Sequence, residues 1–151
     1  MNEAELRAKA LKLLSAREHS RAELQRKLTG HGESTDIQTL LDDLEARDWL
    51  SDARFAQAYV EANAKRFGRY RLEAELRERC VADSTIQAAL AVLADSDDSG
   101  DELGRARAAW EKKFGQLPND TADRAKQARF LQSRGFAYDV IRRVLGGLDD
   151  E

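Results

Sequence analysis

Residues that build turns, disulfides and metal sites are scarce in this chain of 151 residues. One proline and nine glycines are too few for a collagen-like, linker-like or turn-rich all-β protein. The single cysteine, Cys80, excludes an intramolecular disulfide and fits a reducing compartment. With only two histidines beside it, a zinc site of the common kind lacks ligands. The sequence therefore predicts neither a disulfide nor a metal centre.

Membrane-spanning and secretory patterns are also missing. No apolar run approaches the ~20 residues that cross a bilayer as a helix. The N-terminal stretch MNEAELRAKALKLL is charged throughout and has no apolar core of a signal peptide. We therefore expect a cytoplasmic protein that makes no membrane contact.

Helix-forming residues dominate what is present. Ala, Leu, Glu, Arg, Lys and Gln have high helix propensity, and no segment alternates apolar and polar residues long enough to predict a strand. Ser20 precedes Glu23 at the spacing of a capping box. Three more residues precede apolar periodic runs and are predicted N-caps: Asp52, Ser84 and Asp139. The pattern predicts an all-α fold of about nine helices.

Internal repetition groups these helices into three units. An isoleucine with leucines at +4 and +7 occurs three times: Ile37, Leu41, Leu44; Ile86, Leu90, Leu93; and Ile141, Leu145, Leu148. A leucine lies 13, 10 and 10 residues before these triplets, at Leu24, Leu76 and Leu131. Units of about 50 residues typically stack so that each touches only its neighbours. We predict an elongated tandem array of three three-helix repeats, at residues 1–50, 51–98 and 99–151.

Charge is unevenly distributed behind a net charge of −3. Residues 95–102 hold five acids and no base, and residues 149–151 are all acidic. Between them, residues 103–147 hold ten Lys/Arg and four Asp/Glu, a local surplus of +6. A one-sided surplus of this size is typical of a surface that binds a polyanion or an acidic protein face.

Two basic segments are candidates for that contact. In residues 65–71, four bases and two aromatics surround Gly68 with no acid among them. Such a flexible turn could contact phosphate and stack Tyr70 on a base, and the alternative is an ordinary solvated turn. The second segment lies within the C-terminal surplus. The candidate residues are Lys65, Arg66, Arg69, Tyr70, Arg71, Lys112, Lys113, Arg124, Lys126, Arg129, Arg134, Arg142 and Arg143.

No catalytic constellation is apparent in the sequence. His19 lies beside a predicted helix cap and His31 in a glycine turn, with no nucleophile and acid arranged around either. A Gly-Lys-Ser/Thr phosphate loop is missing, so the chain is not expected to hydrolyse nucleotide. Cys80 is interpreted as a passive, semi-buried thiol. We therefore expect a binding protein with no catalytic residue and no cofactor.

An ordered set of motifs runs along residues 8–146. It includes Ala10-Leu11-Lys12-Leu13-Leu14, Arg17-Glu18-His19-Ser20-Arg21-Ala22-Glu23-Leu24, Trp49-Leu50-Ser51-Asp52-Ala53-Arg54-Phe55-Ala56, Gly68, Glu75-Leu76, Lys113-Phe114-Gly115 and Arg134-Gly135-Phe136. This set resembles the RecX family, bacterial regulatory proteins that inhibit the RecA recombinase. One departure is Arg79-Cys80-Val81, where the family usually has a glycine turn. Its absence argues against a left-handed helix cap of the glycine kind at this position.

The resemblance implies three tandem three-helix repeats without a catalytic centre. It also implies binding in the groove of the RecA–single-stranded DNA filament, where the protein would restrain ATP hydrolysis, strand exchange and filament growth. Groove binding and capping of the growing end both stay open, as does direct contact with DNA. For naked DNA, single-stranded or duplex, the local surplus predicts weak, sequence-independent and salt-sensitive binding. No heptad seam predicts a coiled coil, so a monomer is expected.

Two other interpretations remain. The three-helix units could read duplex DNA as helix-turn-helix modules, although no helix carries a compact Arg/Asn/Gln set of the base-reading kind. A purely structural helical scaffold would leave the C-terminal surplus unexplained.

Overall fold

Residues 1–95 and 101–146 are described by a computed structural model, and every regular element within them is an α-helix. In chain order the helices are α1 (Glu3–Ala16), α2 (Arg21–Leu28), α3 (Ser34–Ala46), α4 (Asp52–Asn63), α5 (Arg69–Glu78), α6 (Asp83–Ala94), α7 (Glu102–Lys113), α8 (Thr121–Ser133) and α9 (Tyr138–Gly146). The predicted all-α fold is confirmed.

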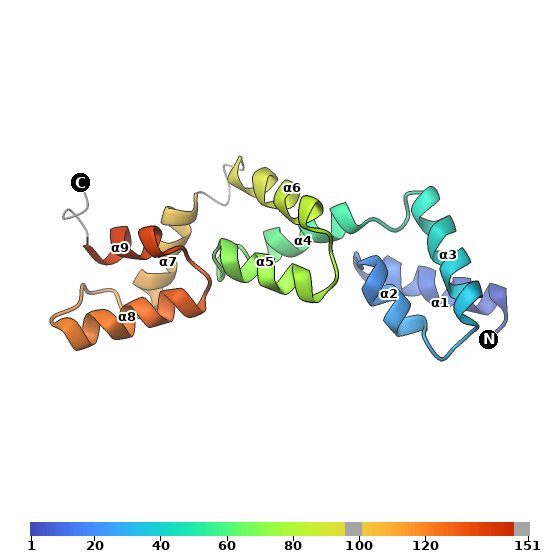
Figure 1. Cartoon of the computed structure of the whole chain (residues 1–151), viewed down its shortest axis with the longest axis horizontal. Helices are drawn as coiled ribbons and strands as arrows, with labels where there is room; N and C mark the ends of the chain where they lie inside the picture. Colours follow the sequence, from blue (N-terminus) through green and yellow to red (C-terminus); the bar gives the residue numbers. More distant parts are fainter. Residues whose placement is uncertain (96–100, 147–151) are drawn as a thin grey trace.

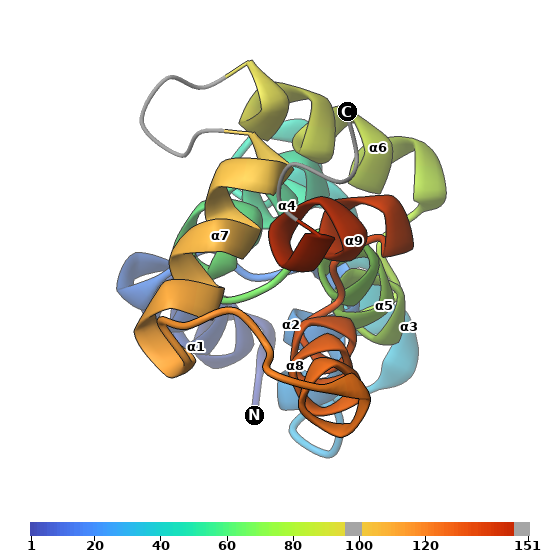
Figure 2. The same ribbon diagram turned by 90° about the vertical axis from the view of Figure 1, so that its left-hand side faces the viewer.

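The helices form three successive groups along one long axis (Figure 1), whereas the view turned by 90° has a compact outline (Figure 2). We name these groups repeat 1 (α1–α3), repeat 2 (α4–α6) and repeat 3 (α7–α9). Each has its own hydrophobic core, and the three leucines predicted as anchors, Leu24, Leu76 and Leu131, are fully buried. The elongated array of three three-helix repeats is therefore confirmed. The predicted boundary at 98/99 and Leu148 of the third triplet lie outside the described residues.

Local capping chemistry decides where the helices begin. The Oγ of Ser20 accepts the N–H of Glu23, whose carboxylate accepts the N–H of Ser20, so the predicted capping box starts α2. The other three predicted caps are wrong by one or two residues and lie inside the first turn: Asp52, Ser84 and Asp139. For α4 the cap is Ser51, whose hydroxyl accepts a backbone N–H. An aspartate in the first turn is still favoured there by the helix dipole.

The second helices of the three repeats, α2, α5 and α8, follow one another head to tail along the long axis (Figure 1). At the contact that we name joint 2–3, the N-terminus of α5 meets the C-terminus of α8. The N–H of Gly68 donates to the carbonyl of Arg134 at 2.7 Å, and the N–H of Tyr70 donates to the carbonyl of Gly135 at 3.0 Å. The exposed amides of one helix end thus satisfy the exposed carbonyls of the next.

The C-terminus of α5 ends in a left-handed cap although it lacks a glycine. Cys80 has a φ of 60°. The N–H of Val81 donates to the carbonyl of Leu76, and that of Cys80 to the carbonyl of Arg77, which is the Schellman arrangement. The expectation that this cap is absent is therefore wrong. The expectation of a semi-buried thiol is wrong as well, because Cys80 is exposed, and that exposure leaves room for its side chain.

We expect Cys80→Gly to raise the free energy of unfolding by about 1 kcal/mol, because glycine adopts the left-handed conformation without the steric cost that a Cβ brings. Cys80→Ala is the matched control, since it removes the thiol and keeps the Cβ. Urea unfolding of the three proteins would measure both effects. An equal gain in Cys80→Ala would attribute the gain to the thiol instead of the backbone.

Candidate binding surface

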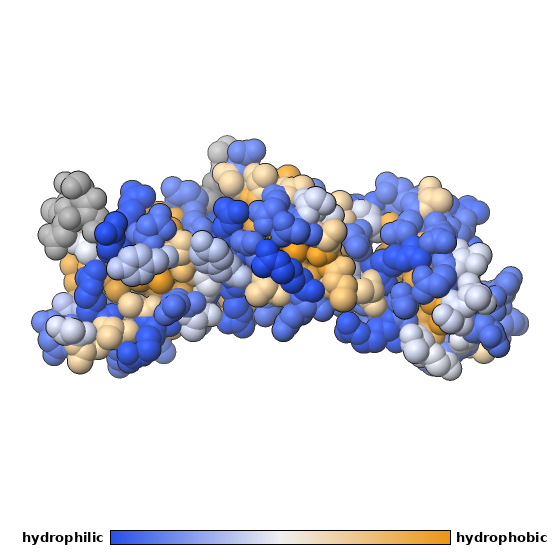
Figure 3. Space-filling model, in the orientation of Figure 1, coloured by the Kyte–Doolittle hydropathy of each residue, from blue (hydrophilic) through white to orange (hydrophobic). Residues whose placement is uncertain are grey.

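The predicted bases of repeat 3 lie on all three of its helices. Lys112 and Lys113 end α7, Arg124, Lys126 and Arg129 lie on α8, Arg134 caps α8, and Arg142 and Arg143 lie on α9. All of these are exposed except Arg134, which is half-buried. At about 100° per residue, Lys126 and Arg129 point away from the buried Leu131 on the same helix. Hydrophilic residues also dominate the visible face of this repeat (Figure 3).

Most of these bases have no partner inside the described chain. The ion pairs that join two described residues all lie within residues 7–83, in repeats 1 and 2. Lys113 and Arg134 lie over the Phe130 ring, at 5.8 and 4.9 Å from its centroid. Five bases have no hydrogen bond or ion pair with another described residue: Lys112, Arg124, Lys126, Arg129 and Arg143. Their charge is therefore available to a partner.

Arg105 belongs to the same sequence surplus but does not face solvent. It is buried, and its Nε donates to the carbonyl of Ala64 at 2.8 Å, while Nη2 lies 3.5 Å from the carbonyl of Phe67. Burial lowers the pKa of this guanidinium, an effect that the neighbouring Asp101 and Glu102 oppose. In the sequence, Arg105 is one of the ten bases of residues 103–147 and looks like a surface charge. In the structure it joins repeat 3 to the end of α4.

The predicted basic turn at 65–71 is packed against repeat 3. Phe67 and Gly68 are buried, and the backbone of Gly68 and Tyr70 is engaged in joint 2–3. The Nη1 of Arg71 also donates across the joint, to the carbonyl of Ser133 at 3.0 Å. The description of this segment as a flexible turn is therefore wrong, because its backbone amides cap α8. Its side chain Tyr70 is nevertheless 60% exposed.

Acids that follow the turn neutralise part of its charge. Arg69 pairs with Glu73 at 3.0 Å and Arg71 with Glu75 at 3.5 Å, both at i,i+4 on α5. Arg66 donates to the side chain of Asn63. Of the four bases, Lys65 alone is exposed without a partner among the described residues. The candidate bases of repeat 3 thus keep more positive charge without a described partner than residues 65–71 do.

At the corresponding contact between α5 and α2, which we name joint 1–2, the repeats meet through side chains. The Oγ of Ser20 lies 3.4 Å from the carbonyl of Arg79, and the N–H of Arg21 donates to Asp52 at 2.7 Å. A hollow of about 370 Å³ remains beside this joint, lined mostly by apolar groups of α4 such as Phe55. Among the described residues, backbone–backbone hydrogen bonds therefore cross joint 2–3 but not joint 1–2.

His19 is buried directly before Ser20, the N-cap of α2. Its Nδ1 lies 3.1 Å from the carbonyl of Arg17, and its Nε2 lies 3.0 Å from the Nζ of Lys27. Burial lowers the pKa of His19, and the charges of Arg17 and Lys27 lower it further. Proton uptake by the folded protein would place a second positive charge against Lys27.

We therefore expect the free energy of unfolding to fall as the pH drops below 6.5, the ordinary pKa of histidine. Below that pH the unfolded chain binds a proton that the folded chain does not. His19→Gln should remove this slope between about pH 7 and 5.5, and His31→Gln, at an exposed position, should keep it. Urea unfolding at three pH values tests both. Loss of the slope in His31→Gln, with the slope retained in His19→Gln, would contradict the assignment to His19.

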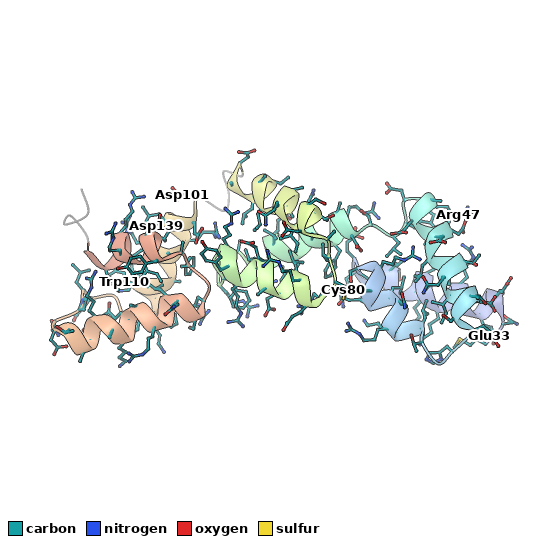
Figure 4. All side chains as sticks on the ribbon, in the orientation of Figure 1. Glu33, Arg47, Cys80, Asp101, Trp110 and Asp139 are labelled. Carbon is teal, nitrogen blue, oxygen red and sulfur yellow. The ribbon has the colours of Figure 1, made fainter. Side chains whose placement is uncertain are left out.

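No group of three or more metal-ligating side chains occurs among the described residues, and no helix in that part of the chain is long and apolar enough to span a bilayer. Of the labelled residues, Asp101 is the N-cap of α7, Trp110 lies on α7 and Asp139 on α9, all in repeat 3, whereas Cys80 lies in repeat 2 (Figure 4). The arrangement can bind a partner through charge and shape.

Three models of one family match successive parts of the chain. They are described as the first, second and third three-helix domains of RecX, and they match residues 7–44, 51–90 and 100–145. The chain belongs to the RecX family. It is 47% identical over 145 residues to the regulatory protein RecX of Ralstonia nicotianae, covering 95% of this chain and 88% of that protein. With the regulatory protein RecX of Chromobacterium violaceum it shares 46% identity over 148 residues, covering 97% and 93%.

Two crystal structures share the fold. The RecX from Lactobacillus salivarius superposes with a TM-score of 0.80 at 21% identity, over 97% of this chain and 96% of that one. A second structure, of a regulatory protein RecX, gives a TM-score of 0.79 at 18% identity, over 95% and 72%. The relatives named above are regulatory proteins by name, which agrees with the expectation of a protein that does not act as an enzyme.

Proposed function

We propose that this protein binds the RecA–single-stranded DNA filament and inhibits its ATPase, strand-exchange and extension activities. The observation that carries the proposal is the surface of repeat 3, where five exposed bases have no partner among the described residues. Membership of a family of regulatory proteins supports it. The candidate contact residues remain those of the two basic segments, with repeat 3 ahead of residues 65–71.

The elongated shape suits binding along a groove. Three repeats in line reach several neighbouring subunits of a helical filament, whereas a compact body of equal mass reaches fewer. Held there, the protein would fix RecA protomers in an unproductive arrangement and obstruct the path of a second DNA strand. Bound at the growing end, it would cap the filament. Both modes use the same basic surface.

We further propose a cytoplasmic monomer that needs no cofactor and catalyses no reaction. Its binding to naked DNA should be weak and independent of sequence, because the net charge of −3 opposes the attraction of the basic repeat for phosphate. Such binding should weaken steeply with added salt.

Titration of the purified protein into RecA on single-stranded DNA tests the proposal. We expect the rate of ATP hydrolysis to fall at fewer than one copy per RecA protomer, because one elongated copy contacts several protomers. An unchanged rate, together with tight and sequence-selective binding to duplex DNA, would instead support a helix-turn-helix regulator.

A further inference from the structure

Two tyrosine side chains next to joint 2–3 are unusually exposed. Tyr70 is 60% exposed and Tyr138 is 76% exposed, although large aromatic rings usually bury most of their surface. They are far apart in sequence. The N–H of Tyr70, however, donates to the carbonyl of Gly135 at 3.0 Å, and Tyr138 follows Gly135 by three residues. Standard chain dimensions therefore place the two Cα atoms within about 18 Å of each other.

Neither ring has a structural task inside the described part of the molecule. Neither phenol hydroxyl has a hydrogen-bond partner among the described residues, and neither ring belongs to a hydrophobic core. The guanidinium of Arg142 lies over the Tyr138 ring at 6.0 Å from its centroid. These two exposed rings thus have no intramolecular reason to be aromatic apart from that one cation–π contact.

Arginines lie close in sequence to both rings. Arg69 directly precedes Tyr70, and Arg142 and Arg143 follow Tyr138 by about one turn of α9. The acids near Tyr138 are Asp139, next to it in sequence, and Glu102, whose carboxylate accepts the N–H of Ala137 at 3.1 Å. Near Tyr70, Glu73 pairs with Arg69 and Glu75 with Arg71. Arginines therefore accompany two exposed aromatic rings, and Arg142 lies over the ring of Tyr138.

We infer that Tyr70 and Tyr138 form a stacking platform for the bases of single-stranded DNA that crosses joint 2–3. This inference rests on the proposed function, because it names the nucleic acid that the filament-bound protein touches. Every base offers a π face, so stacking holds a single strand without reading its sequence, while the neighbouring arginines contact phosphate. Base pairing and stacking hide those faces in a duplex. The platform therefore prefers single strands.

A protein partner is the alternative that the experiment must separate, because tyrosine and arginine are also enriched at protein interfaces. Tyr70 lies in the basic segment 65–71 and Tyr138 within the C-terminal surplus at residues 103–147, which favours a polyanion. The exposed Leu117 in repeat 3, at 54%, has no π face and lies in the loop before α8. It serves as a matched control for loss of an exposed apolar side chain.

Fluorescence anisotropy with a labelled oligothymidylate of about 20 nucleotides, in the absence of RecA, tests the platform. Tyr70→Ala and Tyr138→Ala should each weaken binding by at least about fivefold, the lower end of what one stacked base contributes. Replacement of either tyrosine by phenylalanine should preserve binding, and so should Leu117→Ala. The dependence of affinity on salt should stay unchanged in the alanine variants, because no cation is removed. Binding to a duplex of equal length should not change.

Several outcomes would overturn the inference. If the alanine variants bound the oligonucleotide with the affinity of the parent protein, the two rings would not form a stacking platform. Equal loss in the phenylalanine variants would assign the contact to the hydroxyl. Alanine variants that bind the oligonucleotide normally and yet fail to inhibit RecA would assign the rings to a protein contact. None of these results contradicts the proposed function. That function is wrong only if the parent protein leaves the rate of ATP hydrolysis by RecA unchanged.

Discussion

Replacement of Lys126, Arg129 and Arg143 by glutamate is expected to weaken inhibition of the RecA filament strongly. All three bases are exposed and have no hydrogen bond or ion pair with another described residue, so their reversal breaks no described interaction. A contact with phosphate or an acidic protein surface would turn from attraction to repulsion at three points. We expect the concentration needed for half-inhibition to rise by at least about tenfold. RecA-dependent ATP hydrolysis on single-stranded DNA measures the effect.

The control reverses Lys9, Lys12 and Arg26 in repeat 1, which also lack a partner among the described residues; Lys12 and Arg26 are exposed and Lys9 is half-buried. Both triple variants change the net charge from −3 to −9, because each reversal subtracts two charges. A general effect of net charge would therefore appear equally in both. Thermal melts verify folding, and exposed charges contribute only ~0–1 kcal/mol each to stability. If the repeat 1 variant lost inhibition while the repeat 3 variant kept it, the binding surface would lie at the other end of the array.

Much of the fold could be predicted because each repeat buries its own apolar residues. The isoleucine–leucine triplets and the leucines before them mark one helix face after another, and a local 3.6-residue period is visible without knowledge of tertiary contacts. Leu24, Leu76 and Leu131 are fully buried as expected. Helix starts were less accurate, since Ser51 and the neighbouring Asp52 are both good N-terminal residues and only the backbone conformation decides between them.

The joints could not be predicted because their partners lie far apart in sequence. Gly68 meets residues 134–136, and Arg105 meets the carbonyls of Ala64 and Phe67. A sequence window records Arg105 only as a base among other bases, although it directly precedes the buried Ala106. The charge surplus of repeat 3 was visible in the sequence, and the structure adds that five of its exposed bases have no hydrogen bond or ion pair with another described residue. The exposure of Tyr138 had no sequence signal.

Substitution of Gly135 by alanine is expected to be the most damaging single change at joint 2–3. Gly135 has a φ of +89°, and a Cβ there would lie 2.3 Å from the backbone nitrogen of Arg71. Because α5 is held by its own core, the backbone of Arg71 cannot retreat without loss of the hydrogen bonds from Gly68 and Tyr70. Each such bond contributes about 1 kcal/mol. We expect Gly135→Ala to lower the free energy of unfolding of repeat 3 by about 3 kcal/mol or more.

Gly30→Ala supplies the control, because Gly30 has almost the same φ, +91°, with no atom within 4 Å of the position of a Cβ. It isolates the backbone strain of a left-handed alanine, about 1 kcal/mol, from the collision across the joint. Urea unfolding and small-angle scattering should show a modest loss of stability and an unchanged radius of gyration for Gly30→Ala. For Gly135→Ala they should show a larger loss and a changed radius, as repeat 3 loses its fixed orientation. Inhibition of RecA should weaken in that variant although every basic side chain is retained. Binding along a groove requires the three repeats to keep their relative orientation. Equal losses of stability in the two variants would mean that joint 2–3 accommodates the added methyl group without further cost. The joint would then not fix the orientation of repeat 3.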